Sequence, residues 1–171
     1  MYEGFLSLKY TYILDGSYSI ELLIEVLNDI EVRSKWEEQI LEAELIHRYS
    51  DNFYIYRMLF HMPIIENRDF VEKMIIFKMD DTYYMYSSSI PDTYYPKRSK
   101  CTRGYNIFSV TRIRRVKDKI IVNSASQRDI QASLGPFIGL GVMGRKTANS
   151  LTVFCDALIK RLNALVNSRN P

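Results

Sequence analysis

Asn67-Arg68-Asp69-Phe70 joins two runs of apolar and aromatic residues, Phe53 to Met62 before it and Phe70 to Met79 after it. It sets two opposite full charges side by side where the flanking residues predict buried strands. A buried charge that lacks a partner costs several kcal/mol, so an arginine inside an apolar sheet needs an internal carboxylate or an anionic ligand. The sequence leaves the partner of Arg68 open among Asp69, Glu72, Glu44 and a ligand.

Strands are predicted on both sides of this stretch. Residues 6–12 alternate apolar and polar side chains, as a half-buried strand does. The turn residues Ser50-Asp51-Asn52 and Asp80-Asp81 each join two apolar runs into a hairpin. A long loop with two prolines covers residues 90–100. The predicted strands span residues 6–12, 40–47, 53–60, 70–79, 83–89, 102–113 and 119–129.

Helices are predicted at both ends of the strand succession. Apolar residues between Ile20 and Leu27 recur at i, i+3, i+4 and i+7 after Ser19, a suitable N-cap. A second short helical piece is predicted over Arg33 to Glu38. The strongest pattern is C-terminal, where apolar residues from Leu151 to Val166 keep the 3.6-residue period for about four turns.

Several predicted strands are apolar on both faces. In residues 53–60, Tyr54, Tyr56 and Met58 share one face, and Phe53 and Ile55 share the other. A strongly curved antiparallel sheet wrapped around a helix buries much of both faces. The predicted fold class is therefore α+β, a helix-grip fold of about seven strands around a long C-terminal helix. Because there is no repeat or linker, residues 1–171 are predicted to form a single domain.

The composition favours an ordinary globular protein. A formal net charge of +3 is too small to indicate nucleic acid binding by itself. The 13 tyrosines suit strands, and they also suit a cavity that is partly apolar and partly polar. Cys101 and Cys155 follow no disulfide or metal spacing. Because there is no signal peptide and no apolar run long enough to span a bilayer, we expect a soluble, cytoplasmic protein.

The loop over residues 90–100 combines basic and aromatic side chains, including Tyr94, Tyr95, Lys97 and Arg98. A solvated loop is the commonest interpretation of such a run. Among functional interpretations we favour a membrane surface, since a basic residue near an anionic bilayer contributes ~1 kcal/mol and tyrosines settle at the headgroup level. We therefore expect transient, peripheral contact with an anionic membrane and no nucleic acid partner.

Catalytic motifs receive no support. Gly139-Leu140-Gly141-Val142-Met143-Gly144 matches a dinucleotide fingerprint, but it lies in an antiparallel context without the required parallel strands. It is better explained as a flexible helix entry. His47 and His61 have no partner at metal or catalytic spacing. We predict no enzymatic activity, no catalytic residue, no metal and no cofactor.

A second motif, Arg33-Ser34-Lys35-Trp36-Glu37, follows the first predicted helix. The order of helix, Arg-x-x-Trp-acid, two strands and Asn-Arg-Asp-Phe resembles the START domain, the lipid-transfer module of the steroidogenic-regulatory-protein family. In motif the chain is most similar to the phosphatidylcholine transfer type. The resemblance covers Leu8 to Leu165. The chain begins after the family's N-terminal helix and first two strands, so it also resembles the wider birch-pollen-allergen superfamily.

The resemblance implies one lipid bound between the sheet and the terminal helix. Arg33 matches the arginine that contacts a lipid phosphate, Glu37 matches the acid at the same site, and Arg68 matches an arginine at the cavity wall. Structural interpretations stay open beside these roles: an i,i+4 salt bridge between Arg33 and Glu37, and an internal ion pair for Arg68. The expected cavity lining is Trp36, Tyr54, Tyr56, Met58, Tyr84, Tyr86, Phe154 and Leu158.

The predicted function is therefore that of a monomeric intracellular lipid-transfer protein that carries one lipid, most simply a phospholipid, between membranes. The 90–100 loop and the helix entry at 137–144, with Phe137 and Leu140, are predicted to form a lid hinged at the three glycines. The alternatives are a carrier for a sterol or another apolar ligand and a ligand-free protein-interaction module on the same fold. A cyclase or hydrolase is a weaker fourth interpretation.

Overall fold

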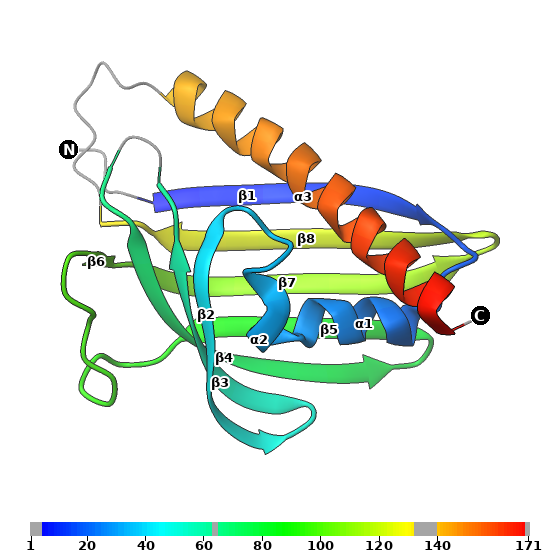
Figure 1. Ribbon diagram of the computed structural model, residues 1–171, viewed down its shortest axis with the longest axis horizontal. Coiled ribbons are helices and arrows are strands. Elements are labelled where there is room, and N and C mark those ends of the chain that lie inside the picture. The colour runs from blue at the N-terminus through cyan, green and yellow to red at the C-terminus, as the bar shows by residue number, and fades with distance from the viewer. Residues whose placement is uncertain (1–4, 63–64, 132–139, 170–171) are drawn as a thin grey trace.

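One antiparallel sheet bends around the long C-terminal helix, as Figure 1 shows. The computed structural model describes residues 5–62, 65–131 and 140–169. The strands are β1 (Phe5–Asp15), β2 (Ile40–Ser50), β3 (Phe53–Phe60), β4 (Arg68–Met79), β5 (Thr82–Ser89), β6 (Thr102–Arg103), β7 (Tyr105–Val116) and β8 (Lys119–Asp129). The helices are α1 (Ile20–Asn28), α2 (Ile30–Arg33) and α3 (Leu140–Arg169).

The strands follow the order β1-β8-β7-β5-β4-β3-β2, and all neighbours along this path are antiparallel. The predicted helix-grip class is confirmed. The described part of the sheet has 8 strands rather than seven, because β6 pairs in parallel with Arg68 and Asp69 at the start of β4. A two-residue strand has no detectable alternation, so sequence periodicity could not separate β6 from β7.

Each of the three sequence-predicted helices has a counterpart in the structure, with different ends. Ser19 caps α1, because its hydroxyl accepts a hydrogen bond from the Leu22 amide at 3.0 Å. The second helical piece was expected over residues 33–38, but α2 ends at Arg33. A turn continues to Glu37, whose amide donates to the Arg33 carbonyl at 3.0 Å. The terminal helix covers Leu140–Arg169, which is longer than the segment from Leu151 to Val166 over which the apolar residues keep the helical period.

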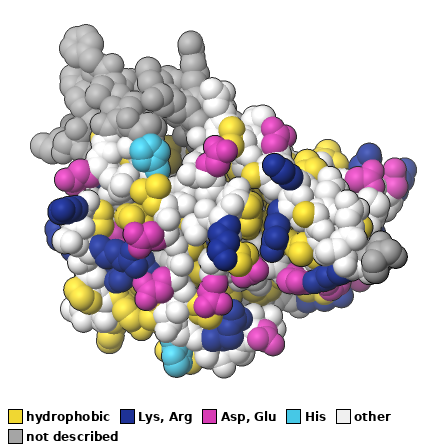
Figure 2. Space-filling model, viewed as in Figure 1, with side chains coloured by type: hydrophobic (Ala, Val, Ile, Leu, Met, Phe, Trp, Pro, Cys, Tyr) yellow, Lys and Arg dark blue, Asp and Glu magenta, His cyan; other side chains and the backbone are white. Residues whose placement is uncertain are grey.

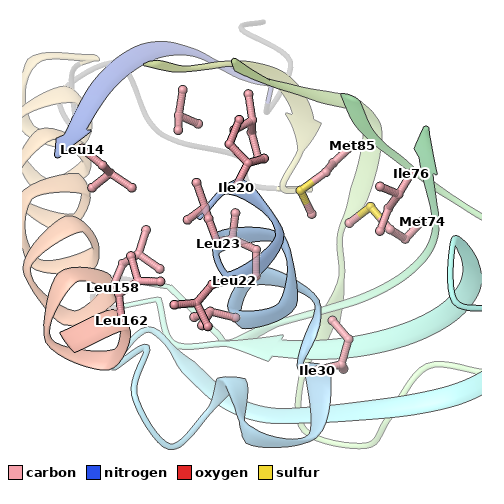
Figure 3. Close-up of a cluster of buried hydrophobic side chains, with 14 of the residues drawn as sticks. Leu14, Ile20, Leu22, Leu23, Ile30, Met74, Ile76, Met85, Leu158 and Leu162 are labelled. Carbon is pink, nitrogen blue, oxygen red and sulfur yellow. The ribbon is translucent and has the colours of Figure 1, made fainter. Parts of the chain in front are cut away.

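The core lies between the concave face of the sheet and two helices (Figure 3). In this view Leu158 and Leu162 of α3 and Leu22 and Leu23 of α1 point toward one another. Methionines of β4 and β5 line the far side of the same cluster, with Met85 among them. Burial of these apolar side chains, at roughly 25 cal/mol per Å² of surface, holds the helices on the sheet. The side chains of the core leave a cavity over one part of the concave face of the sheet.

A close approach between Gly104 and Phe70 gives a first prediction. A Cβ at Gly104 would lie 2.5 Å from Cζ of the Phe70 ring, which is itself buried. Overpacking of this kind costs about 1–3 kcal/mol, so Gly104→Ala should lower the free energy of unfolding by about that amount in urea. Phe70→Leu, although destabilising alone, should relieve part of the effect in the double variant. Strict additivity of the two substitutions would show that the ring contact is not the cause.

Candidate functional site

The less filled part of the concave face is a cavity of about 200 Å³ between the sheet and α3. Inward-facing residues of β1, β3, β4, β5, β7 and β8 form its floor and sides. Phe154, Leu151 and Ser150 of α3 cover it, and Arg33 and Glu37 come from α2 and the turn after it. The helix is thus one wall of the cavity, so any movement of α3 relative to the sheet changes its volume.

Small hydroxyl side chains cross the cavity floor. They lie on the adjacent strands β5, β7 and β8, where alternation turns every second side chain inward. Thr111 and Ser124 share a hydrogen bond of 3.1 Å across β7 and β8. Aromatic and thioether side chains form much of the rest, so the surface suits a ligand that is both apolar and polar. The hydroxyl residues on these strands are Ser87, Ser109, Thr111, Ser124 and Ser126.

Arg33 and Glu37 meet at the cavity wall. The Arg33 Nε lies 2.7 Å from Oε2 of Glu37, and its Nη1 donates to the Leu27 carbonyl at 2.8 Å. The guanidinium also lies over the rings of Trp36 and Phe154, at 5.5 and 6.0 Å from their centroids. Burial lowers the pKa of Arg33, but the Glu37 carboxylate more than offsets this and the pKa is raised. The structure therefore contains the predicted i,i+4 salt bridge and places it in the cavity.

Two tyrosines present neutral phenols to the cavity. Burial, followed by the neighbouring Tyr10, raises the pKa of Tyr12 far above its ordinary value. Burial and the charge of Glu72 raise the pKa of Tyr56 well above its ordinary value. Both hydroxyls consequently remain protonated throughout the physiological pH range. The Tyr56 hydroxyl donates a hydrogen bond to Oε2 of Glu72 at 2.7 Å.

Glu72 is the centre of a buried polar cluster. Besides the Tyr56 hydroxyl, its Oε2 accepts from Ser87 Oγ at 2.9 Å and from Asn106 Nδ2 at 2.7 Å. Its other oxygen, Oε1, lies 3.9 Å from Nη2 of Arg128 on β8. Sequence analysis missed Glu72 and Arg128 as site residues. The alternation of β8 could have indicated Arg128, because this residue follows Ser124 and Ser126 at every second position of the strand and so shares their face.

The structure divides the predicted lining residues into three groups. Tyr56, Met58 and Phe154 line the cavity. Tyr54 and Leu158 lie within the packed core, and Trp36 packs against it without lining the cavity.

Tyr84 and Tyr86 do not line the cavity, which corrects their predicted placement. β5 turns Met85 and Ser87 inward, so the two tyrosines take the outer face. There the Tyr84 ring stacks on exposed Phe77 with centroids 5.1 Å apart.

Arg68 is buried but does not line the cavity. Its guanidinium donates to the backbone carbonyls of Ile130 and Glu66, and burial lowers its pKa although Glu66 opposes this. The predicted cavity-wall role is therefore corrected: Arg68 ties β4 to the segment after β8. Within the described residues, Arg68 forms its hydrogen bonds with backbone carbonyls and not with Asp69, Glu72 or Glu44, the three carboxylates that the sequence left open.

Asp69 points to the opposite face, where a fully buried carboxylate meets two arginines. Arg103 Nη2 lies 2.9 Å from Oδ2, and Arg57 Nε lies 3.4 Å from Oδ1. The amide of Arg98 also donates to Asp69, at 3.3 Å. Both charges of the Asn-Arg-Asp-Phe motif thus have partners inside the protein, although Oδ1 of Asp69 accepts no hydrogen bond within the described structure.

The loop over residues 90–100 lies against this outer face. Arg103 bridges Asp69 to Asp92, at 2.6 Å, and to the Tyr95 carbonyl at 3.1 Å. Arg98 forms ion pairs with Glu42 and Glu44 of β2. No residue of this loop lines the cavity, so its predicted role as a lid is wrong for this conformation. The alternation of β2 and β3, which directs Glu44 and Arg57 outward, draws the loop to that side.

The other predicted lid residues are not placed. Phe137 lies outside the described residues, and nothing is described of the Leu140 side chain. Figure 2 shows the face of the molecule in the view of Figure 1, where acidic and basic side chains are interleaved. Neither the acidic nor the basic side chains form a continuous patch on the face in view. Within the described residues, no helix is long and apolar enough to cross a membrane.

The topology and the cavity can be compared with known proteins. The family model for the START domain matches residues 16–134. The chain belongs to the START domain family. The curated proteins contain no significant match to this START domain.

Solved structures agree on the fold. Human STARD10 superposes with a TM-score of 0.73 at 22% identity, over 89% of this chain and 63% of the STARD10 chain. Human StAR-related lipid transfer protein 5 gives a TM-score of 0.73 at 20% identity, over 93% of this chain and 76% of its own. This chain thus spans less than two thirds of STARD10. At these identities the likeness establishes the fold.

The same fold also occurs in an enzyme. The Zhui aromatase/cyclase from a Streptomyces species superposes with a TM-score of 0.62 at 8% identity, over 97% of this chain and 98% of its own. Fold alone therefore does not separate a carrier from an enzyme. Membership of the START family supports lipid binding and transfer in general. Which lipid the cavity accepts depends on the residues that line it.

Proposed function

We propose that this START domain is an intracellular carrier that holds one lipid, a phospholipid, in its cavity and exchanges it during transient contact with a membrane. The observation that carries the proposal is the cavity itself. It lies between the sheet and α3, and it combines apolar rings with hydroxyls and two arginines, Arg33 and Arg128. A partly open cavity with this mixture of surfaces suits a molecule with acyl chains and a polar headgroup.

The energetics of acyl chains suit a shuttle. Burying a CH₂ group contributes ~0.8 kcal/mol, so two chains of about 16 carbons contribute roughly 25 kcal/mol of gross transfer energy. Leaving the bilayer costs a similar amount, so the net free energy is near zero. Headgroup contacts of a few kcal/mol then decide which lipid is carried. Arg33 and Glu37 are the headgroup pair that the family resemblance indicates.

The cavity has to widen when a lipid enters. Its volume of about 200 Å³ is below the roughly 300–1,000 Å³ of ordinary small-molecule sites. Because α3 supplies the covering wall through Leu151 and Phe154, displacement of α3 from the sheet is the simplest way to enlarge it. We propose that this displacement occurs at the cytoplasmic surface of a membrane, where the apolar side of the helix would meet acyl chains.

A sterol or another apolar ligand is the second candidate, and one observation favours it. Arg33 is already neutralised by Glu37, and the floor carries five hydroxyl side chains that suit a single ligand hydroxyl. In that case Arg33 is structural and the cavity discriminates little between headgroups. A ligand-free interaction module on the same fold is the third candidate.

Native mass spectrometry of the protein purified from cells tests the proposal. We expect a mass increase of one phosphate-containing lipid, and we expect transfer of phosphatidylcholine between two vesicle populations. A neutral lipid in its place would favour the sterol-type carrier. A consistently empty protein that transfers nothing would overturn the carrier function itself.

Substitution of Arg33 separates the two carrier hypotheses. Arg33→Gln should reduce transfer of phosphatidylcholine at least tenfold while sterol transfer is retained, since a charge-assisted contact contributes about 1.5–3 kcal/mol. An equal loss of both activities, with a lowered melting temperature, would instead show that the Arg33–Glu37 pair maintains the fold. Glu37→Gln is the matched control, because it removes the partner and retains the arginine.

A further inference from the structure

Arg128 is a cavity arginine whose Nε donates no hydrogen bond within the described structure. Its guanidinium carbon lies 5.4 Å from the ring centroid of Phe60 and 5.3 Å from that of Phe70. Its Nε is buried and has no hydrogen-bond partner within the described structure. Its one acidic neighbour there is Glu72, at 3.9 Å from Nη2, which is beyond hydrogen-bond distance.

Arg33, the other arginine among the described cavity residues, already has hydrogen-bond acceptors. Two of its nitrogens already donate, one to Glu37 at 2.7 Å and one to a backbone carbonyl at 2.8 Å. Arg128 lies on the same cavity surface with a partly exposed side chain, and in the described part of the chain its Nε has no acceptor. A ligand that needs a hydrogen-bond donor therefore meets less competition at Arg128 than at Arg33.

The surroundings of Arg128 hold it in place without satisfying it. Two phenyl rings fix the plane of the guanidinium by cation–π contact. Glu72 cannot turn toward it freely, because three donors hold its Oε2: Tyr56, Ser87 and Asn106. An unsatisfied buried N–H costs about 1–3 kcal/mol. Four arginines of the described structure have a buried Nε without a partner, and of these Arg128 is the one that lines the cavity. A planar guanidinium with free donors matches the two oxygens of a phosphate or a carboxylate.

We propose that Arg128 is an oxyanion-binding site of the cavity, which holds the phosphate or the carboxylate group of the bound lipid. This proposal rests on the carrier function above and adds a headgroup contact on β8 to the one proposed for the Arg33–Glu37 pair in the same cavity. Ser126, two positions earlier on the same inward face of β8, lies within the same cavity and offers a hydroxyl. Glu72 keeps the net charge of the site low before the lipid arrives.

The experiment compares three lipids with similar chains. Vesicles of phosphatidylcholine carry a small fraction of pyrene-labelled phosphatidylcholine, pyrene-labelled diacylglycerol or a pyrene-labelled fatty acid, and binding is read from pyrene fluorescence. The wild-type protein should bind one of the two oxyanion lipids at least tenfold better than diacylglycerol. Arg128→Gln should remove that preference and leave diacylglycerol binding within about twofold. The lipid that loses affinity identifies phosphate or carboxylate as the ligand group.

Two further variants keep the result interpretable. Arg128→Lys retains the charge but not the planar fork, so an intermediate preference is expected even if Arg128→Gln folds poorly. Arg112→Gln removes an arginine from the outer face of β7 and should change nothing. The oxyanion site is overturned if the wild type shows no preference, or if the Arg128 variants keep it in full. A wild type that binds none of the three lipids overturns the carrier function as well.

Discussion

Asp69→Ala should lower the free energy of unfolding by about 3–5 kcal/mol, because it removes the buried carboxylate that two arginines share and leaves them with only their more exposed acidic partners, Asp92 and Glu44. Asp69 is 0% exposed, and Arg103, which lies 2.9 Å from it, is 5% exposed. Arg57 also faces the same carboxylate at 3.4 Å. Without Asp69 two guanidinium groups remain close together with their common counter-charge removed. Urea denaturation of the variant and the wild type measures the difference.

The same substitution should release the loop over residues 90–100. Arg103 links Asp69 to Asp92 and to the Tyr95 carbonyl, and the Arg98 amide donates directly to Asp69. Loss of the carboxylate removes the centre of these contacts. Limited proteolysis should therefore cleave the loop faster in Asp69→Ala, and Asp69→Asn should show the effect of charge alone.

Arg98→Ala is the matched control for this network. It removes two ion pairs, with Glu42 and Glu44, but both acids are more than half exposed. Exposed pairs contribute about 0–1 kcal/mol, so this variant should remain close to the wild type. If Asp69→Ala were as mild as Arg98→Ala, the buried network would not be a determinant of the fold.

Most of the fold could be predicted because its signals are local. The predicted bounds of β8, 119–129, coincide with the observed strand, and the Ser19 cap lies where the sequence indicated. Alternation and the 3.6-residue period depend on neighbouring residues along the chain, so they are readable without tertiary information. β6 escaped detection because its pairing with β4 is set by residues more than thirty positions apart, Arg68 and Thr102.

The site was harder to predict because it depends on which face of each strand turns inward. β5 carries large apolar residues on both faces, and the bulkier tyrosines were assigned to the cavity. Met85 and Ser87 occupy the inward positions instead, since Tyr84 packs on Phe77 outside. Arg33 and Glu37 were predicted because the Arg-x-x-Trp-acid motif, which carries the resemblance to the START domain, is contiguous in the sequence. Arg128 and Glu72 come from strands far apart in sequence, and no local pattern joins them.

Ser126→Phe should abolish lipid exchange without destabilising the protein. Ser126 is buried, and it faces the cavity from the middle of the hydroxyl row. A phenyl ring there occupies space that the bound lipid needs, so transfer of pyrene-labelled phosphatidylcholine between vesicles should fall more than tenfold. The cavity of about 200 Å³ has room for the ring, which gains dispersion contacts with the surrounding side chains. The melting temperature should consequently be unchanged or higher.

Gln127→Phe provides the comparison on the neighbouring position of β8. Its side chain is directed to the outer face, so the same ring is added to the same strand without entering the cavity. Exchange should then remain within about twofold of the wild type. Unimpaired exchange by a folded Ser126→Phe variant would show that lipids do not occupy this cavity. Because the two variants differ in the face that receives the ring, a large difference between them locates the lipid on the concave side of the sheet.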